Sequence, residues 1–334
     1  MSYRTFLLIF GLLSFAGITF GQQKIKGITM VAPKKEFNNN PLDKIAEHEA
    51  NWVCLVPFAF MRNDDPALSY DKAWQWWGET PAGIKKSIRK AKDSGLNVML
   101  KPQIYIPGSW IGDLKFKSEE DWTAWEKNYK EYLMKMVEIA IEEDVGMICL
   151  GTEINHSIKK REKYWRGIIA EIRQKYDGLL TYSANWDTYK EMPLWDALDF
   201  IGISAYFPLS KTETPTQREL LRKWRPIITK LELFSKENNK PILFTEYGYL
   251  SVDGCAYRAW ELEKEVHQLD INEQAQANAL DALFMANWNQ SYWAGGFLWK
   301  WFPNMDGHEG YPEKDYTPQN KISAKVLQRW YSRN

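Results

Sequence analysis

Residues 241–248 read Pro-Ile-Leu-Phe-Thr-Glu-Tyr-Gly, an apolar run that ends on a carboxylate, Glu246. Residues 147–153, Met-Ile-Cys-Leu-Gly-Thr-Glu, follow the same pattern and end on Glu153. Short runs that are apolar at nearly every position are typical of parallel strands buried on both faces. A carboxylate at the end of such a strand must be paired, hydrogen-bonded or used in chemistry.

Similar apolar runs recur along the chain, separated by longer stretches with helical periodicity. Together with these two they are residues 25–31, 52–57, 97–101, 147–151, 180–183, 200–204, 242–245 and 296–299. Strands that alternate with helices pair in parallel through right-handed crossovers. Eight such units fit an α/β fold of one domain, the (β/α)8 or TIM barrel, which typically takes about 250 residues. An open doubly wound sheet is the alternative, but it usually has a glycine-rich turn after the first strand, where this chain has Val31-Ala32-Pro33.

The helical stretches carry recognisable start signals. Pro81 opens the first of them, and Ser118 is expected to cap the second, with Asp121 three residues later. The expected helices cover residues 81–94, 118–139, 164–176, 219–238 and 273–289. The tryptophans within them are expected to pack in the core: Trp122, Trp125, Trp165 and Trp224.

The N-terminus has the features of a secretory signal. Residues 1–21 combine a positive charge at Arg4 with an uncharged apolar run and a small residue, Gly21, before the expected cleavage point. The run is short for a membrane span, which needs about 20 residues. We therefore expect a mature catalytic domain of residues 22–334, secreted or periplasmic, with no membrane span.

Composition excludes several classes of function. The 43 basic and 43 acidic residues balance, which argues against a nucleic-acid partner. The three cysteines do not indicate a disulfide framework, and the four histidines lack the spacing of metal ligands. We expect no metal and no cofactor, and no pattern marks an oligomer interface. The 17 tryptophans exceed the needs of a core, and some are expected to line a site for a ligand with flat apolar faces.

In a TIM barrel the functional side chains lie where the strands end. Glu153 and Glu246 are then expected to face one cleft, and two carboxylates in one cleft are the machinery of glycoside hydrolysis. The structural alternative is that one of them only pairs with a lysine or arginine of the barrel. Around the pair, sugar rings would stack on aromatic rings, and sugar hydroxyls would bond to amides and amines. Strand-end residues expected to bind substrate in this way are Lys101, Gln103, Trp110, Asn185, Trp186, Tyr206, Trp299 and Trp301.

Several of these segments resemble one family of retaining glycosidases on this scaffold, the family 113 endo-β-1,4-mannanases. The similar segments are residues 99–102, 150–153, 201–208, 241–248 and 296–299. The resemblance implies that Glu153 is the acid/base, that Glu246 is the nucleophile with Tyr206 beside it, and that Trp299 floors the subsite of the cleaved sugar.

Two positions depart from the related enzymes. Thr152 stands where most have an asparagine that bonds the sugar 2-hydroxyl, and Gln103 stands where a histidine is expected. The hydroxyl of Thr152 could still make that bond, or Asn155 or Asn185 could reach in. The expected activity is double-displacement hydrolysis of β-1,4-mannan or manno-oligosaccharides. The alternatives are a retaining hydrolase of another β-glycan and a non-catalytic glycan-binding barrel.

Overall fold

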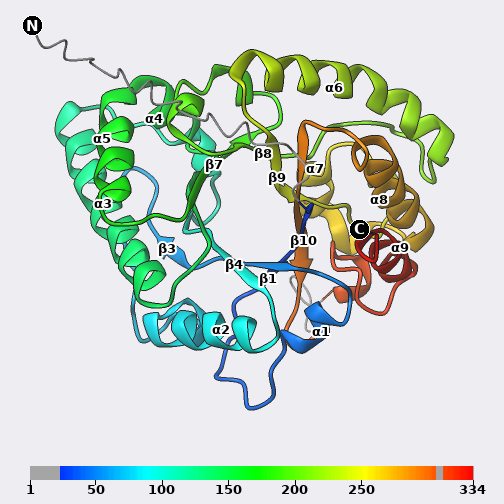
Figure 1. Ribbon diagram of the computed structural model, residues 1–334, viewed down its shortest axis with the longest axis horizontal. Helices are drawn as coiled ribbons and strands as arrows, with labels where there is room; N and C mark the ends of the chain where they lie inside the picture. Colours follow the sequence, from blue (N-terminus) through cyan, green and yellow to red (C-terminus); the bar gives the residue numbers. More distant parts are fainter. Residues whose placement is uncertain (1–22, 306–310, 334) are drawn as a thin grey trace, which may run out of the picture.

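The computed structural model describes residues 23–305 and 311–333. Within them the strands form a closed barrel in the order β1-β10-β9-β8-β7-β6-β4-β2, with every neighbouring pair parallel (Figure 1). The strands are β1 (Ile25–Met30), β2 (Trp52–Leu55), β4 (Asn97–Leu100), β6 (Met147–Thr152), β7 (Leu179–Asn185), β8 (Ile201–Ser204), β9 (Ile242–Tyr247) and β10 (Trp293–Trp301). Each predicted apolar run is one of these strands, so the single-domain TIM barrel is confirmed. The expected signal segment, residues 1–21, lies outside the described residues.

Helices surround the strands and bury their outer faces (Figure 1). They are α1 (Asp43–Ala46), α2 (Pro81–Asp93), α3 (Glu119–Glu142), α4 (Asn155–Lys160), α5 (Glu162–Arg173), α6 (Gln217–Asn238), α7 (Ala259–Leu262), α8 (Glu273–Asn287) and α9 (Ile322–Tyr331). The predicted cap of α3 is confirmed: Ser118 Oγ accepts a hydrogen bond from the backbone N–H of Asp121 at 3.0 Å. No helix in these two stretches is long and apolar enough to cross a membrane.

The large aromatic side chains of the helices fill the layer between helices and barrel. Trp125, Trp165 and Trp224 are completely buried, and Trp122 nearly so, as predicted. Trp125 stacks on Tyr129 with ring centroids 5.0 Å apart. Complete burial of a large apolar side chain stabilises the fold by about 1.5–3 kcal/mol. These tryptophans therefore act in packing and are not available to a ligand.

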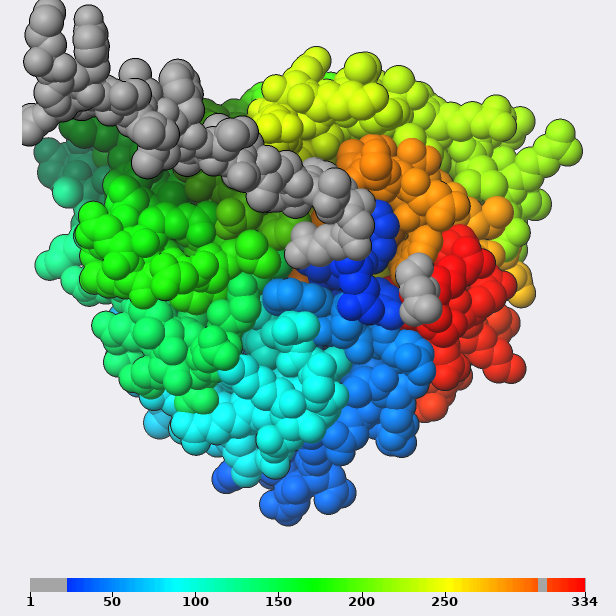
Figure 2. All heavy atoms as spheres, viewed as in Figure 1, coloured from blue at the N-terminus to red at the C-terminus, as the bar shows by residue number. Residues whose placement is uncertain are grey.

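The two ends of the described chain meet where the barrel closes. The Tyr331 hydroxyl, on α9, donates to Gly27 O on β1 at 2.7 Å, and Lys26 Nζ donates to Tyr331 O at 2.5 Å. Figure 2 shows the blue N-terminal segment and the red C-terminal helix on one face of the molecule. The last helix thus fastens the first strand into the barrel.

A second, smaller sheet was not expected from the sequence. Strands β3 (Phe58–Phe60) and β5 (Gln103–Tyr105) pair in parallel just beyond the ends of β2 and β4. Because β2 and β4 are themselves neighbours, the small sheet continues this part of the barrel wall outward. It lies at the end of the barrel where Glu153 and Glu246 lie.

Candidate active site

Glu246 lies on β9, is 8% exposed, and accepts hydrogen bonds from three side chains. Lys101 Nζ and Gln103 Nε2 donate to Oε1, the latter at 3.0 Å, and the Tyr206 hydroxyl donates to Oε2 at 3.0 Å. Lys101 follows β4 directly and is completely buried. Burial opposes its charge, but Glu246, Cys54 and Cys149 together outweigh burial, so the pKa of Lys101 is raised. Three donors, one of them a buried ammonium group, therefore converge on this carboxylate.

Glu153 follows β6 in a backbone conformation that is uncommon for a residue with a side chain. Its φ is 54°, and its backbone N–H donates a hydrogen bond to Ser183 O at 2.8 Å. Non-glycine residues in this left-handed region cost conformational energy and cluster at functional sites. Its carboxylate Oε2 accepts a hydrogen bond from Trp110 Nε1 at 2.8 Å.

The surroundings of Glu153 change its proton affinity. Burial and, next, the charge of Glu246 raise the pKa of Glu153 to about 7, while hydrogen bonds from Trp110 and Ser204 oppose the rise. One acid is therefore protonated over part of the neutral range, and the other is paired with a buried cation. A carboxyl group with a raised pKa next to a second carboxylate is suited to donate a proton.

The structural alternative for a strand-end glutamate is realised in part, because Glu246 does pair with a barrel lysine. That pair does not close the site, since Oε2 of Glu246 also contacts Tyr206 and its charge reaches Glu153. Lys101 instead offsets the repulsion between two acids in one cleft. The pairing is compatible with a charged nucleophile and would be a poor environment for a proton donor.

Two tryptophans lie beside the carboxyl groups or their partners, and others follow the ends of neighbouring elements. Trp299, on β10, lies with its ring centroid 5.5 Å from Lys101 Nζ. Trp110 is 41% exposed although its indole N–H is bonded to Glu153. Trp186, after β7, stacks on Trp260 of α7 with centroids 6.0 Å apart and an interplanar angle of 27°. Trp260 was missed, because nothing in its local sequence separates it from a packing tryptophan.

Trp301 does not join this group, although it was expected to. It is buried and packs edge-on against His48. The cause is a bulge in β10. Trp299 pairs with Thr29, and Trp301 pairs with the next residue of β1, Met30, so β10 has one extra residue at this point. Consecutive residues of a strand point to opposite faces, and partners in register share a face. Trp299 and Trp301 therefore point in opposite directions.

Three polar residues expected to contact sugar, Asn185, Asn155 and Thr152, differ in their hydrogen bonding in the structure. Asn185 Oδ1 bonds its neighbour's backbone N–H, of Trp186, at 2.9 Å. Asn155 begins α4 and accepts from Thr188 Oγ1 at 3.2 Å. Thr152 Oγ1 is buried without a hydrogen-bond partner among the described residues. A buried hydroxyl without a partner is costly, and this one adjoins Glu153 in the chain.

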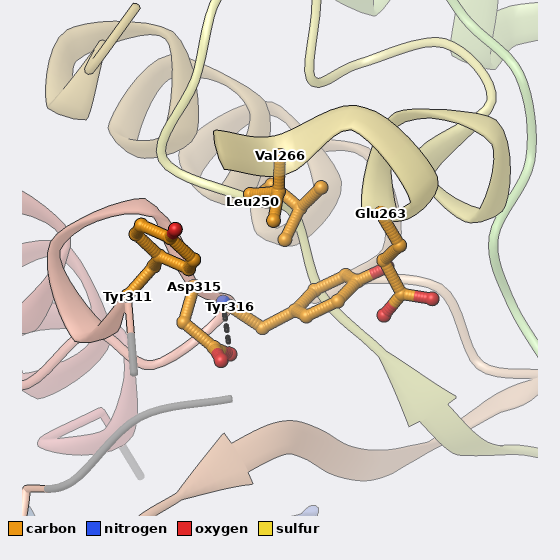
Figure 3. Close-up of a pocket in the computed structure, with 6 residues that line it drawn as sticks. All are labelled: Leu250, Glu263, Val266, Tyr311, Asp315 and Tyr316. Atoms are coloured by element: carbon orange, nitrogen blue, oxygen red, sulfur yellow. Dashed lines mark hydrogen bonds between the residues drawn. The ribbon is translucent and has the colours of Figure 1, made fainter. Parts of the chain in front are cut away.

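A second layer of side chains supports Tyr206. The ring of Tyr316 packs against that of Tyr206 with centroids 6.2 Å apart. A small pocket beside Tyr316 is lined by Leu250, Glu263, Val266, Tyr311, Asp315 and Tyr316 (Figure 3).

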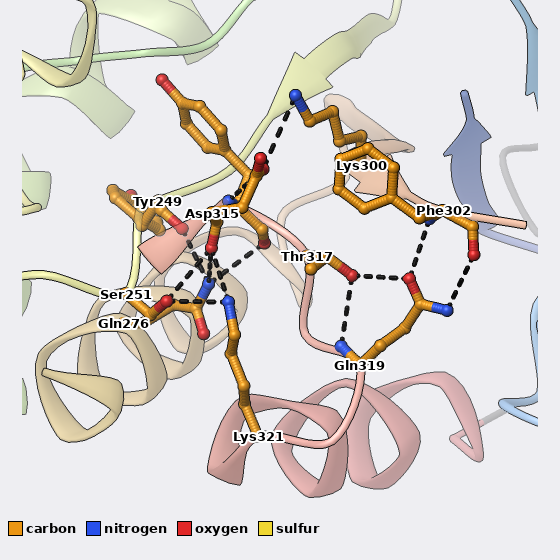
Figure 4. A network of polar contacts seen from close by, with 10 residues as sticks. Tyr249, Ser251, Gln276, Lys300, Phe302, Asp315, Thr317, Gln319 and Lys321 are labelled. Carbon is orange, nitrogen blue, oxygen red and sulfur yellow. Dashed lines mark hydrogen bonds and ion pairs between the residues drawn. The ribbon is translucent and has the colours of Figure 1, made fainter. Parts of the chain in front are cut away.

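A buried polar network anchors the segment that carries Tyr316 (Figure 4). Lys321 Nζ donates to Ser251 Oγ and to Asp315 O, each at 2.7 Å, and Gln276 Nε2 donates to Tyr316 O at 3.0 Å. The Asp315 carboxylate is 3.5 Å from Lys300 Nζ. Burial lowers the pKa of Lys321 to about 8. This network holds residues 315–321 against the site.

Within residues 23–305 and 311–333, no group of three or more histidine, cysteine, aspartate or glutamate side chains is arranged to hold a metal ion. The cysteines, Cys54, Cys149 and Cys255, are free and buried.

A carboxylate paired with a buried lysine and a carboxyl group with a raised pKa, beside tryptophans where barrel strands end, fit the site of a glycoside hydrolase. Comparisons with known proteins agree with this class of enzyme and identify the family within it. The model of Glycoside Hydrolase Family 113 matches residues 18–321, and the chain belongs to this family.

Solved structures of the same family are similar over nearly the whole chain. The GH113 β-mannanase from Alicyclobacillus acidocaldarius, solved in complex with ManMIm, is 27% identical with a TM-score of 0.82, over 94% of this chain and 98% of that one. A GH113 β-1,4-mannanase, also solved as a complex, is 25% identical with a TM-score of 0.79, over 93% of this chain and 100% of that one. Fungal β-1,4-galactanases, 13% identical with a TM-score of 0.58, share the fold alone. The comparison with curated proteins found no match.

Proposed function

We propose that the protein is a retaining β-1,4-mannanase in which Glu246 is the nucleophile and Glu153 the acid/base. The observation that carries this proposal is the contrast between the two carboxyl groups. Glu246 accepts three hydrogen bonds, one of them from a buried lysine, whereas the pKa of Glu153 is raised to about 7. A nucleophile must be ionised and a general acid must be protonated at the working pH.

In the first step Glu153 donates its proton to the glycosidic oxygen, and Glu246 attacks the anomeric carbon as the bond to the leaving sugar breaks. The product is a covalent glycosyl ester on Glu246. Forming the ester removes the negative charge that helps to raise the pKa of Glu153. Glu153 then becomes a better-ionised base, takes a proton from water, and the water oxygen attacks the anomeric carbon to release Glu246.

The choice of mannan draws support from the family and from its solved members. Both GH113 structures described above are mannanases, at 25–27% identity. We further propose that the enzyme cleaves within the chain and that residues 1–21 direct it out of the cytoplasm.

Two variants test the roles of the glutamates. Glu246→Ala is expected to lower kcat on mannan by at least about 10⁴-fold, because no covalent intermediate can form. Formate or azide should restore turnover of an activated aryl mannoside by filling the space, which also shows that the variant is folded. Glu153→Ala should be slow on mannan yet keep most of its first-step rate on substrates whose leaving group needs no proton.

Glu232→Gln, in a surface pair with Lys236 on α6, is the matched control and should leave kcat unchanged. Substantial turnover of mannan by Glu246→Ala without added anion would contradict its role as nucleophile. Equal losses on both kinds of substrate in Glu153→Ala would contradict its role as acid.

A further inference from the structure

The small sheet β3–β5 presents one face to solvent. Its strands pair Phe58 with Gln103, and Phe60 with Tyr105. The residue between each pair of these positions, Ala59 on β3 and Ile104 on β5, is buried. Alternate side chains of a strand share a face. Phe58, Phe60, Gln103 and Tyr105 therefore form the opposite face, which is the one open to solvent. Tyr105 is 50% exposed.

This face begins at the nucleophile. Gln103 Nε2 donates to Glu246 Oε1 at 3.0 Å. Tyr105 lies two residues further along the same strand and on the same face, a rise of about 7 Å. The aromatic surface is therefore continuous with the catalytic site and leads outward from it.

Trp74 extends the surface. Its ring contacts Phe60 edge-on, with centroids 4.9 Å apart, and Phe60 contacts Tyr105 in the same way at 5.7 Å. Trp74 is 60% exposed. We call Phe58, Phe60, Trp74 and Tyr105 the aromatic platform.

The backbone holds the platform rigidly. Gln75, next to Trp74, donates from Nε2 to Phe58 O at 2.9 Å. The N–H of Phe60 donates to Ser69 O at 2.8 Å, and the N–H of Met61 donates to Tyr105 O at 3.1 Å. A surface fixed before its ligand arrives loses little entropy on binding.

We propose that the aromatic platform is a distal subsite, which binds sugar units of the same polysaccharide chain that passes through the catalytic site. The proposal rests on the proposed function and deepens it. The platform side chains carry no charge, and flat, exposed rings fit the C–H faces of neutral pyranose units. Continuity with Gln103 and Glu246 identifies the occupant as the substrate chain rather than a separate ligand.

The test compares a long substrate with a short one in the full-length enzyme. Trp74→Ala/Tyr105→Ala is expected to raise KM for β-mannan or mannohexaose by about tenfold, because two stacking surfaces are lost. Its kcat/KM on an aryl mannoside, which occupies only the catalytic site, should stay within about twofold of wild type. Trp74→Phe/Tyr105→Phe keeps the rings and should restore most of the affinity.

Leu233→Ala removes an exposed apolar side chain from α6 and is the control for lost surface area. The proposal is overturned if the alanine variant loses activity equally on both substrates, or if long-chain KM does not change. It is also overturned if wild type sediments as a dimer and the variant as a monomer, since a second copy would then cover the platform. If wild type cleaves a different glycan, the proposed substrate fails, and the same comparison on that polymer and its aryl glycoside still decides the role of the platform.

Discussion

Trp110 both faces solvent and bonds the candidate proton donor. Its indole N–H donates to Glu153, and a hydrogen bond to the charged form of an acid lowers the pKa of that acid. Trp110→Phe removes the donor and keeps a ring. The pKa of Glu153 should then rise above its value of about 7. Because the general acid must be protonated, the alkaline limb of the kcat/KM profile should move to higher pH by up to about one unit.

Trp76→Phe is the matched control, because Trp76 is similarly exposed at 40%. Its pH profile should coincide with that of wild type. An unchanged or acid-shifted alkaline limb in Trp110→Phe would contradict the bond between Trp110 and the acid.

At the same scale, the sequence located both glutamates, and the resemblance placed Tyr206 beside Glu246, where its hydroxyl indeed donates to the carboxylate. Lys101 and Gln103 were expected to bind sugar, yet each contacts Glu246. Strand-end position shows that a side chain reaches the cleft, while its partner there depends on neighbouring strands. Trp301 shows a second limit of prediction from sequence. A bulge in β10 turns the side chain of Trp301 away from the cleft, and nothing in the sequence of that strand marks the bulge.

Helix α3 begins at a cap that can be tested by itself. Ser118→Ala removes the acceptor for the N–H of Asp121 and should lower the free energy of unfolding by about 1 kcal/mol. Urea unfolding measures the change. Thr123→Ala, one turn into α3, removes a hydroxyl that bonds Glu119 O within the helix and should change stability by less than about 0.5 kcal/mol. A larger loss for Thr123→Ala than for Ser118→Ala would contradict the capping role.

The elements found from sequence are those with a strong period or a continuous apolar run. All eight barrel strands satisfy that condition, because both of their faces are buried. Strands β3 and β5 have three residues each, too few to show alternation, and pairing depends on the barrel placing them together. Helices α4 and α9, of six and ten residues, were also missed. Helices this short depend on tertiary packing more than on local sequence.

Barrel closure is a property of the whole molecule, and Tyr331 tests it. Its hydroxyl donates to Gly27 O and lies 2.6 Å from the Tyr247 hydroxyl. Tyr331→Phe removes both of these buried hydrogen bonds, which costs about 1–3 kcal/mol, so the thermal midpoint should fall by several degrees. The kcat at 25 °C should not change, because Tyr331 does not contact Glu153 or Glu246.

Tyr249→Phe provides the comparison, since the buried Tyr249 hydroxyl has no hydrogen-bond partner among the described residues. Its removal should leave the thermal midpoint unchanged or raise it. A larger loss for Tyr249→Phe than for Tyr331→Phe would contradict the account of closure.

The central claim concerns how the two carboxyl groups divide the reaction, and the anomeric form of the first product reports on it directly. Proton NMR during early hydrolysis of a manno-oligosaccharide, before mutarotation, distinguishes the two forms. Double displacement through Glu246 predicts that the β-anomer appears first and the α-anomer grows in later. Initial release of the α-anomer would mean a single displacement by water, and would contradict the role of Glu246 as nucleophile.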